Sequence, residues 1–308
     1  MDTRKCHRLT VPVLLVIIAA IALASQSQAG QTQQVVKETV VAQAAKAPEE
    51  TTWQRVQREK VVRFAFNNEM PMSGVGLNGK LIGQAPMVAE AIFKKHGIKV
   101  EAVVAEWSSL IPALHAKRFD MIASCMYITP ARCEQVAFSI PDICIGIGVV
   151  VKAGNPYNIH SYKDILSNPR VKVGCIAGGS QCQVLRELGL EDSRRIEFPD
   201  NKAALAALQS ARIDVFSQNT LNIAWELKLL SDPGLQEALP FEQPTVGGRN
   251  LGGCCAYTFR KDDKDFIEWF NAQLKQLRDS GDELKMIRHL GYDERHIATT
   301  SGEEFCRK

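Results

Sequence analysis

Short segments with strand character alternate with segments of helical periodicity along most of this chain, and this alternation limits the folds that it can adopt. The first strand pattern is VVRFAF from Val61. Further strands are expected at 99–104, 119–123, 145–152, 171–176, 195–198 and 213–217, and helices at 86–96, 110–117, 161–166, 182–188, 202–211, 225–230 and 262–278. Strands that alternate with helices predict an α/β protein with helices on both faces of its sheets.

The stretch 118–141 carries the most informative local pattern. Thr129 and Pro130 have the form of a helix N-cap followed by a proline in the first turn. Arg132, with its planar set of donors, follows the cap by three residues, which predicts a carboxylate site at the start of a helix. The alternative is that Arg132 pairs with a surface carboxylate such as Glu134.

The first 29 residues have the pattern of a secretory signal peptide. Basic residues precede an apolar run from Val11 to Ala24, and the small-residue pattern Ser-Gln-Ala ends at Ala29. A run of about 14 residues is short for a membrane span. We therefore predict cleavage after Ala29 and export to the periplasm, with a retained anchor as the alternative. Residues 30–51 show no helical face and are expected to form a flexible leader.

Composition agrees with an ordinary globular protein. The chain has 308 residues, of which 45% are hydrophobic and 23% are charged, and this length provides for two lobes with separate cores. Without the predicted signal peptide, 34 basic and 33 acidic residues remain. This charge balance implies no nucleic-acid partner.

Eight cysteines remain after the predicted cleavage. They are Cys125, Cys133, Cys144, Cys175, Cys182, Cys254, Cys255 and Cys306. An even number in an exported protein predicts disulfides, whose connectivity the sequence leaves open. Buried thiols are the alternative for Cys144 and Cys254. No CxxC pair and no nearby histidine is present, so we predict no metal site, and no cofactor is expected.

A glycine-rich turn, AGGSQ at residues 177–181, is expected to open a helix. Glycine lets backbone N–H groups approach an anion closely. The turn lacks the spacing of dinucleotide and nucleotide-triphosphate loops.

The chain resembles the family 3 solute-binding proteins of bacterial ABC importers, which take up amino acids and related zwitterions. Asp120, Ile122, Thr129 and Arg132 carry this resemblance in the pattern GxxDxIxxxxxxTxxR, which is followed by an apolar-aromatic segment and a proline. The likeness extends over about 61–292. The run SLIPALHAKRFDMIASCMYITPARCEQVAFS is closer still to the branch that binds ectoine and hydroxyectoine.

This resemblance implies a type II periplasmic binding protein: two α/β lobes, each a mixed sheet flanked by helices, with the ligand cleft between them. Lobe 1 is expected at 52–148 and 249–308, and lobe 2 at 149–248. The implied partners are a small zwitterionic ligand and the permease and ATPase subunits at the inner membrane. The protein is expected to be a monomer.

The resemblance also implies which side chains converge on the ligand. The expected ligand-binding residues are Glu69, Met72, Trp107, Tyr127, Thr129, Arg132, Gly179, Ser180, Gln181 and Asn219. In the family the arginine at position 132 grips the α-carboxylate of the ligand. Positions 72, 107 and 127 are aromatic in the ectoine branch and form a box around a cationic ring. Met72 departs from this pattern, although a thioether is polarizable enough to cover a ring.

Asn219 is a second departure. Many amino-acid binders of the family carry an aspartate near this position for the α-ammonium group, and an asparagine supplies no charge. A ligand whose cationic nitrogen meets Glu69 would suit this chain better. The alternative for Glu69 is an exposed loop carboxylate.

We predict a binding protein that performs no chemistry. The alternative is a periplasmic enzyme on the same fold, similar to cyclohexadienyl dehydratase, with Glu69 and His115 or His160 as an acid/base pair. His115 falls inside a helix and His160 in a turn, which favours surface positions for both. A binding lobe of a periplasmic redox or receptor system is a further alternative, because of the eight cysteines.

Overall fold

The structure is a computed structural model that describes residues 49–246, 249–250 and 252–307. Residues 51–308 form one compact unit. The predicted signal peptide and most of the predicted leader lie outside the described residues. Within the described ranges, no helix combines the length and the apolar character that crossing a membrane requires.

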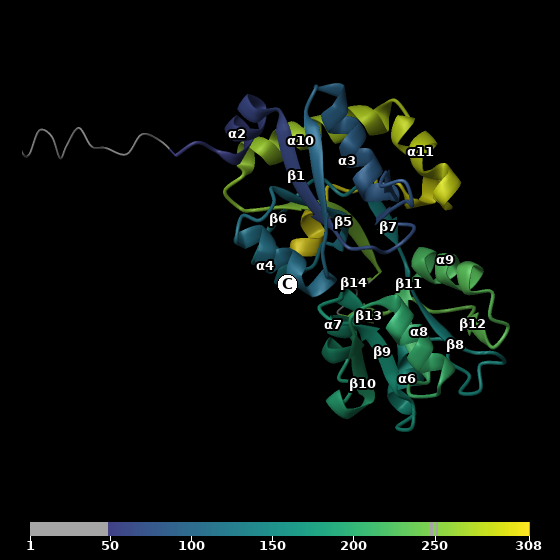
Figure 1. The fold of residues 1–308 in the computed structure, drawn as a ribbon. Coiled ribbons are helices and arrows are strands. Elements are labelled where there is room, and N and C mark those ends of the chain that lie inside the picture. The colour runs from purple at the N-terminus through teal and green to yellow at the C-terminus, as the bar shows by residue number, and fades with distance from the viewer. Residues whose placement is uncertain (1–48, 247–248, 251, 308) are drawn as a thin grey trace, which may run out of the picture. The chain divides into compact units, whose positions relative to one another are not determined.

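Two mixed sheets form the frame of this unit (Figure 1). Sheet A has the order β4-β1-β5-β15-β6, with β7 also paired to β15. Its strands are β1 (Val61–Phe66), β4 (Lys99–Val104), β5 (Met121–Tyr127), β6 (Ala137–Phe138), β7 (Ile143–Ile145) and β15 (Gly253–Phe259). β1 is parallel to β4 and β5, whereas β15 is antiparallel to β5, β6 and β7.

Sheet B has the order β10-β9-β11-β8-β12. Its strands are β8 (Ile147–Lys152), β9 (Val173–Ile176), β10 (Arg195–Phe198), β11 (Val215–Asn219) and β12 (Leu235–Glu237). β9 is parallel to β10 and β11, and β8 is antiparallel to β11 and β12. Two small ladders lie outside the sheets: β2 (Gly74–Val75) with β3 (Leu81–Ile82), and β13 (Thr245–Val246) with β14 (Arg249–Asn250).

Helices accompany both sheets, which confirms the predicted α/β class. Along the segments that build sheet A they are α2 (Thr52–Glu59), α3 (Gln84–Lys95), α4 (Leu110–His115), α5 (Pro130–Cys133), α10 (Lys264–Asp279) and α11 (Asp282–Ile287). Along those of sheet B they are α6 (Tyr162–Ser167), α7 (Ser180–Glu187), α8 (Asn201–Gln209) and α9 (Thr220–Leu230). Five 3₁₀ turns complete the described chain, among them η1 (Trp107–Ser109) and η5 (Glu303–Cys306).

Helix α10 packs its predicted apolar face into the core. Phe266, Phe270 and Leu274 recur at helical spacing and are fully buried. Trp269 is only partly buried and stacks on Trp53 of α2 with ring centroids 4.2 Å apart. The apolar stripe is therefore core packing, as expected.

The expected strand at 145–152 is wrong as a single element. The chain forms β7 in sheet A, breaks at Gly146 and continues as β8 in sheet B. The amide of Gln243 binds both backbone groups of Ile147, accepting from its N–H at 2.8 Å and donating to its carbonyl at 2.7 Å. Since Gln243 lies on the return path to sheet A, this amide ties the two crossings between the sheets together.

Two strands of the site also differ from expectation. β5 begins at Met121 and runs to Tyr127, beyond the predicted end at Ala123, because β15 pairs with it as far as Cys255 opposite Tyr127. β11 likewise extends to Asn219 through its pairing with β8. Both extensions carry polar residues to the ends of the strands.

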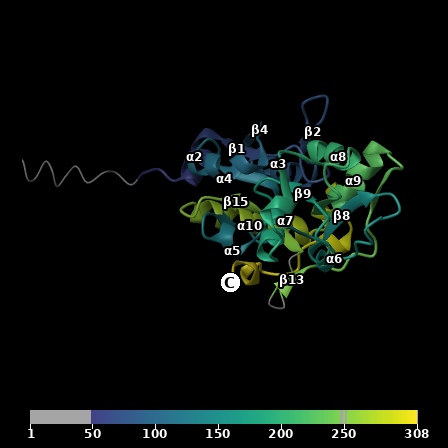
Figure 2. The same ribbon diagram turned by 90° about the horizontal axis from the view of Figure 1, so that it is seen from below.

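Four disulfides join all eight expected cysteines. They are Cys125–Cys255, Cys133–Cys306, Cys144–Cys254 and Cys175–Cys182. The alternative of buried thiols at Cys144 and Cys254 is therefore wrong, since these residues face each other across β7 and β15. The bridge from Cys133 holds the C-terminal turn, yellow in Figure 2, beside α5.

Candidate functional site

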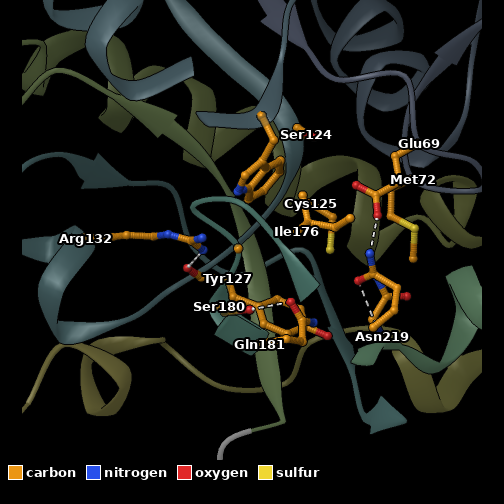
Figure 3. A pocket seen from close by; sticks show the side chains of 13 residues that line it. Glu69, Met72, Ser124, Cys125, Tyr127, Arg132, Ile176, Ser180, Gln181 and Asn219 are labelled. Atoms are coloured by element: carbon orange, nitrogen blue, oxygen red, sulfur yellow. Dashed lines mark hydrogen bonds between the residues drawn. The ribbon is translucent and has the colours of Figure 1, made fainter. Parts of the chain in front are cut away.

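A pocket lies between the two sheets, and the space free of protein atoms in and around it, including open solvent at its mouth, is about 420 Å³ (Figure 3). Nine of the ten residues expected to bind ligand line it: Glu69, Met72, Trp107, Tyr127, Arg132, Gly179, Ser180, Gln181 and Asn219. Four further lining residues were not predicted: Ser124, Cys125, Ile176 and Gln218. Thr129 is the exception, because it lines a neighbouring cavity and its hydroxyl caps α5 by accepting from the N–H of Arg132 at 3.4 Å.

The positions of these residues follow from the sheet topology. β1 and β5 are parallel neighbours in sheet A, and β9 and β11 are parallel neighbours in sheet B. Strands β5, β9 and β11, together with the segments that follow the four strands, supply all of the lining except Trp107, which follows β4. Ligands of open α/β sheets bind at this edge.

Arg132 is 6% exposed, and its guanidinium turns toward the pocket. It donates to the carbonyl oxygens of Tyr127 at 2.8 Å and Gly178 at 3.1 Å, and its Cζ lies 5.3 Å from the ring centroid of Trp107. Burial lowers the pKa of Arg132 to about 10, so the side chain is charged at neutral pH. This burial contradicts a surface pairing with Glu134. Because α5 has only four residues, the positive charge that it presents to the pocket is the guanidinium and not a helix dipole.

The glycine turn faces Arg132 from sheet B. Gly178 has φ +73° and lies against Ser108 and Trp107. A Cβ on Gly179 would lie 2.8 Å from the carbonyl oxygen of Ile176, so only glycine fits there. Helix α7 begins at Ser180, two residues before the predicted start, and its N-cap Gly179 supplies no side-chain acceptor for the first N–H groups. These groups favour an anion.

Glu69 is half-buried, which contradicts the alternative of an exposed loop carboxylate. Its Oε2 accepts from Nδ2 of Asn67 at 2.5 Å, and its Oε1 accepts from Nε2 of Gln218 at 2.8 Å and Nδ2 of Asn201 at 3.3 Å. Burial raises the pKa of Glu69, and the amide donors Asn67 and Asn201 oppose the rise. Figure 3 places Glu69 and Arg132 on opposite sides of the pocket.

The three positions of the expected aromatic box are all at the pocket. The indole N–H of Trp107 donates to the carbonyl of Gly178 at 3.1 Å, and the hydroxyl of Tyr127 donates to the carbonyl of Ile145 at 3.0 Å. Met72 is 2% exposed and completes the set. Two aromatic faces and a thioether therefore line the space between the charged groups.

Asn219 has a structural task in addition to its place in the lining. Its Oδ1 accepts from the N–H of Asn222 at 2.8 Å and so caps α9. The position carries no charge, as the sequence indicated.

Neither His115 nor His160, the candidate bases of the enzyme alternative, lines the pocket. Among the described residues, no three His, Cys, Asp or Glu side chains form a group that could hold a metal ion.

Two sheets crossed twice by the chain, with a charged pocket between them, define a solute-binding protein of the periplasmic type. Residues 62–289 match the family described as "Bacterial extracellular solute-binding proteins, family 3". The chain belongs to this family, as its sequence predicted.

Individual relatives support this family assignment. A probable amino-acid ABC transporter periplasmic-binding protein of Sinorhizobium fredii is 33% identical over 80% of this chain and 82% of its own length. The arginine-binding extracellular protein ArtP of Bacillus subtilis is 29% identical over 67% of this chain and 76% of its own length.

Solved structures give the same result. EhuB in complex with hydroxyectoine has a TM-score of 0.77 and 34% identity, covering 83% of this chain and 98% of EhuB. An ancestral amino acid-binding protein, a precursor of cyclohexadienyl dehydratase, has a TM-score of 0.68 and 28% identity, covering 78% of this chain and 99% of that protein. The relatives are named as binding proteins, so a binding protein and not an enzyme is the function that these comparisons favour.

Proposed function

We propose that this protein is the substrate-binding component of an ABC importer and that its ligand is a small zwitterion of the ectoine or polar amino-acid type. The observation that carries the proposal is the placement of Arg132 and Glu69 on opposite sides of one pocket. A carboxylate would bind the guanidinium and the first N–H groups of α7. The cationic group would lie near Glu69.

Within this class, two observations favour an ectoine-like cation over a primary ammonium. Trp107, Tyr127 and Met72 present polarizable surface to the pocket, which suits a delocalised cation. Asn219, in contrast, has no charge to offer an α-ammonium, and its amide oxygen already caps α9. EhuB, which this chain resembles, was solved with hydroxyectoine.

Ligand capture would proceed by hinge closure of two lobes. We infer that lobe 1 comprises residues 52–148 and 249–308 and lobe 2 residues 149–248, a division that follows the strands of sheets A and B except for Ile147 and Gly148, the first two residues of β8. The Ile147–Gln243 pairing then lies at the hinge. The closed protein would deliver its ligand to permease and ATPase subunits. We infer that the protein acts as a periplasmic monomer after cleavage of its signal peptide.

A thermal-shift screen tests this function. The mature protein is heated with ectoine, hydroxyectoine, glycine betaine and the common amino acids, because a ligand that binds the native state raises Tm by mass action. We expect ectoines or polar amino acids to raise Tm. If none of these compounds shifts Tm and calorimetry detects no binding, the proposed function is wrong.

A further inference from the structure

Three buried side-chain amides of the sheet B side form a chain of hydrogen bonds that ends on the sheet A side. The backbone N–H of Asn219 donates to Oε1 of Gln218 at 2.9 Å. Nε2 of Gln218 donates to Oδ1 of Asn201 at 2.9 Å, and Nδ2 of Asn201 donates to Oδ1 of Asn222 at 2.8 Å. Nδ2 of Asn222 finally donates to the carbonyl of Met70 at 2.8 Å.

The groups at the two ends of this series of hydrogen bonds fix the direction in which each amide donates. The backbone N–H of Asn219 can only donate, and the carbonyl of Met70 can only accept. Each of the three amides therefore has its oxygen committed to a donor and its NH₂ group directed onward. None of them can flip without breaking two hydrogen bonds. The exposed fractions of Gln218, Asn201 and Asn222 are 4%, 7% and 0%, so these amides have little contact with water that could replace their partners.

The hydrogen-bonded amides contact Glu69 through their NH₂ groups. The second hydrogens of Gln218 Nε2 and Asn201 Nδ2 both point to Oε1 of Glu69, at 2.8 and 3.3 Å. Two donors at one oxygen suit a carboxylate and leave no acceptor for a carboxylic acid proton at that oxygen. Oε2 also accepts, from Asn67. The carboxylate keeps free capacity for about one further strong donor, since it has about four lone-pair sites.

We propose that Gln218, Asn201 and Asn222 form a positioning relay that holds Glu69 as an ionised carboxylate and thereby makes the pocket selective for ligands with a cationic nitrogen. This inference rests on the proposed function and deepens it. The relay reaches Glu69 and the carbonyl of Met70 from the sheet B side, so both sides of the pocket contribute to the counter-charge for the ligand. Asn201 and Asn222 act only through their hydrogen-bond partners, since neither of them lines the pocket itself.

Other charged and titratable groups face Glu69 and enter any pH effect. The cavity that adjoins Glu69 is lined by four charged residues: Glu226 of α9, Glu106 before η1, and Asp200 and Lys202 at the start of α8. On its remaining sides Glu69 faces Tyr127, Tyr292 and Arg132. Glu226 acts on Glu69 as a like charge and favours its protonation. The amide relay works against this effect.

The test compares Gln218→Met and Asn201→Ala with wild type. Gln209→Met is the matched control, because Gln209 is an exposed amide of α8 that bonds only Asp232 among the contacts described. Two quantities are measured on the mature protein: the titration of the Glu69 carboxyl by ¹³C NMR without ligand, and the affinity for hydroxyectoine and for L-arginine by calorimetry at about pH 5.5 and about pH 8. Asn201→Ala keeps the test valid where Gln218→Met fails to fold.

The relay predicts that Glu69 protonates at higher pH in both variants than in wild type and in the control. It also predicts that the variants lose about tenfold more affinity at pH 5.5 than at pH 8. A structural defect would instead lower the affinity equally at both pH values, and this result, or an unchanged Glu69 titration, would overturn the relay. If wild type binds neither probe while the titration still moves, the relay is supported and the proposed function fails.

Discussion

The guanidinium of Arg132 lies 5.3 Å from the ring centroid of Trp107, and both side chains donate to the same carbonyl oxygen, that of Gly178. The acceptor belongs to the glycine turn after β9, and the two donors come from segments that follow strands of sheet A. One backbone oxygen thus orients both the cation and the aromatic face of the pocket. The remaining N–H groups of Arg132 stay available for a ligand carboxylate.

We expect Arg132→Ala to abolish measurable binding of a zwitterion. The change removes a charge-assisted, bidentate contact of about 2 to 4 kcal/mol, which corresponds to about 30-fold to 1,000-fold in Kd. Calorimetry with the best compound of the thermal screen measures the loss. Arg132→Lys keeps the charge without the planar fork and should fall between wild type and Arg132→Ala. The exposed Arg118→Ala serves as control, and equal affinity of all three variants would show that Arg132 has a structural role only.

Asn219→Asp should shift the preference of the pocket toward ordinary α-amino acids. An aspartate caps a helix as well as an asparagine does, so α9 is expected to persist. The added charge would attract an α-ammonium and improve the affinity for L-arginine relative to hydroxyectoine by about tenfold. Asn219→Ser, which retains a cap without a charge, is the control. Equal weakening of both ligands would refute this interpretation of the position.

The Cys175–Cys182 disulfide encloses the glycine turn, and its removal should loosen the anion site. Replacing both cysteines by serine is expected to cost about 2 to 3 kcal/mol of unfolding free energy by the chain-entropy estimate for a short loop. Urea unfolding measures this loss, and calorimetry should show weaker ligand binding. Removing Cys133–Cys306 in the same way is the comparison, because this bridge holds the C-terminal turn. Full retention of affinity without Cys175–Cys182 would show that the turn is rigid by itself.

Asp142 should make the stability of the protein fall as the pH rises. Burial, and the charge of Glu283, raise the pKa of Asp142 to about 7, above its value of about 4 in an unfolded chain. The folded state therefore binds the proton more tightly, and the resulting stabilisation is present below about pH 4 and is lost as the pH rises through about 7.

Asp142→Asn tests this effect. Nε2 of Gln84 donates to Oδ2 of Asp142 at 2.7 Å, and Oε1 of Gln84 has no partner among the described residues. A flip of the Gln84 amide would let that oxygen accept from the side chain introduced by Asp142→Asn. Relative to wild type, the variant should gain at least about 1 kcal/mol between pH 5 and pH 8 in urea unfolding. The exposed Asp279→Asn is the control, and parallel pH profiles for all three proteins would contradict the expectation.

The sequence predicted those parts of the site whose signals are local or carried by the family resemblance. Arg132 follows an N-cap and a proline, and Glu69 and Trp107 follow strands with clear apolar patterns, so their convergence was expected. Gln218 could have been found, since it precedes Asn219 at the end of the same strand. Asn201 had no such signal, because an amide in the first turn of a helix is common in any α/β protein.

The features that the sequence did not predict depend on pairing between segments that are far apart in the chain. The break at Gly146 was missed because an apolar run has the same pattern whether it pairs in one sheet or in two. Disulfide connectivity was open for a similar reason, since three of the four bridges join cysteines more than 100 residues apart. Thr129 was expected at the ligand because it belongs to the family motif, yet its hydroxyl serves the helix that carries Arg132.

β15 is inserted between β5 and β6, although it follows them by more than 100 residues. Wherever the chain folds as it emerges, β5 therefore appears with one side unpaired, and all of sheet B must follow before the missing neighbour is available. Until then, the early half of the chain exposes a strand that could pair with another nascent polypeptide. Shielding by a holdase chaperone during that interval would protect the yield of correctly folded protein.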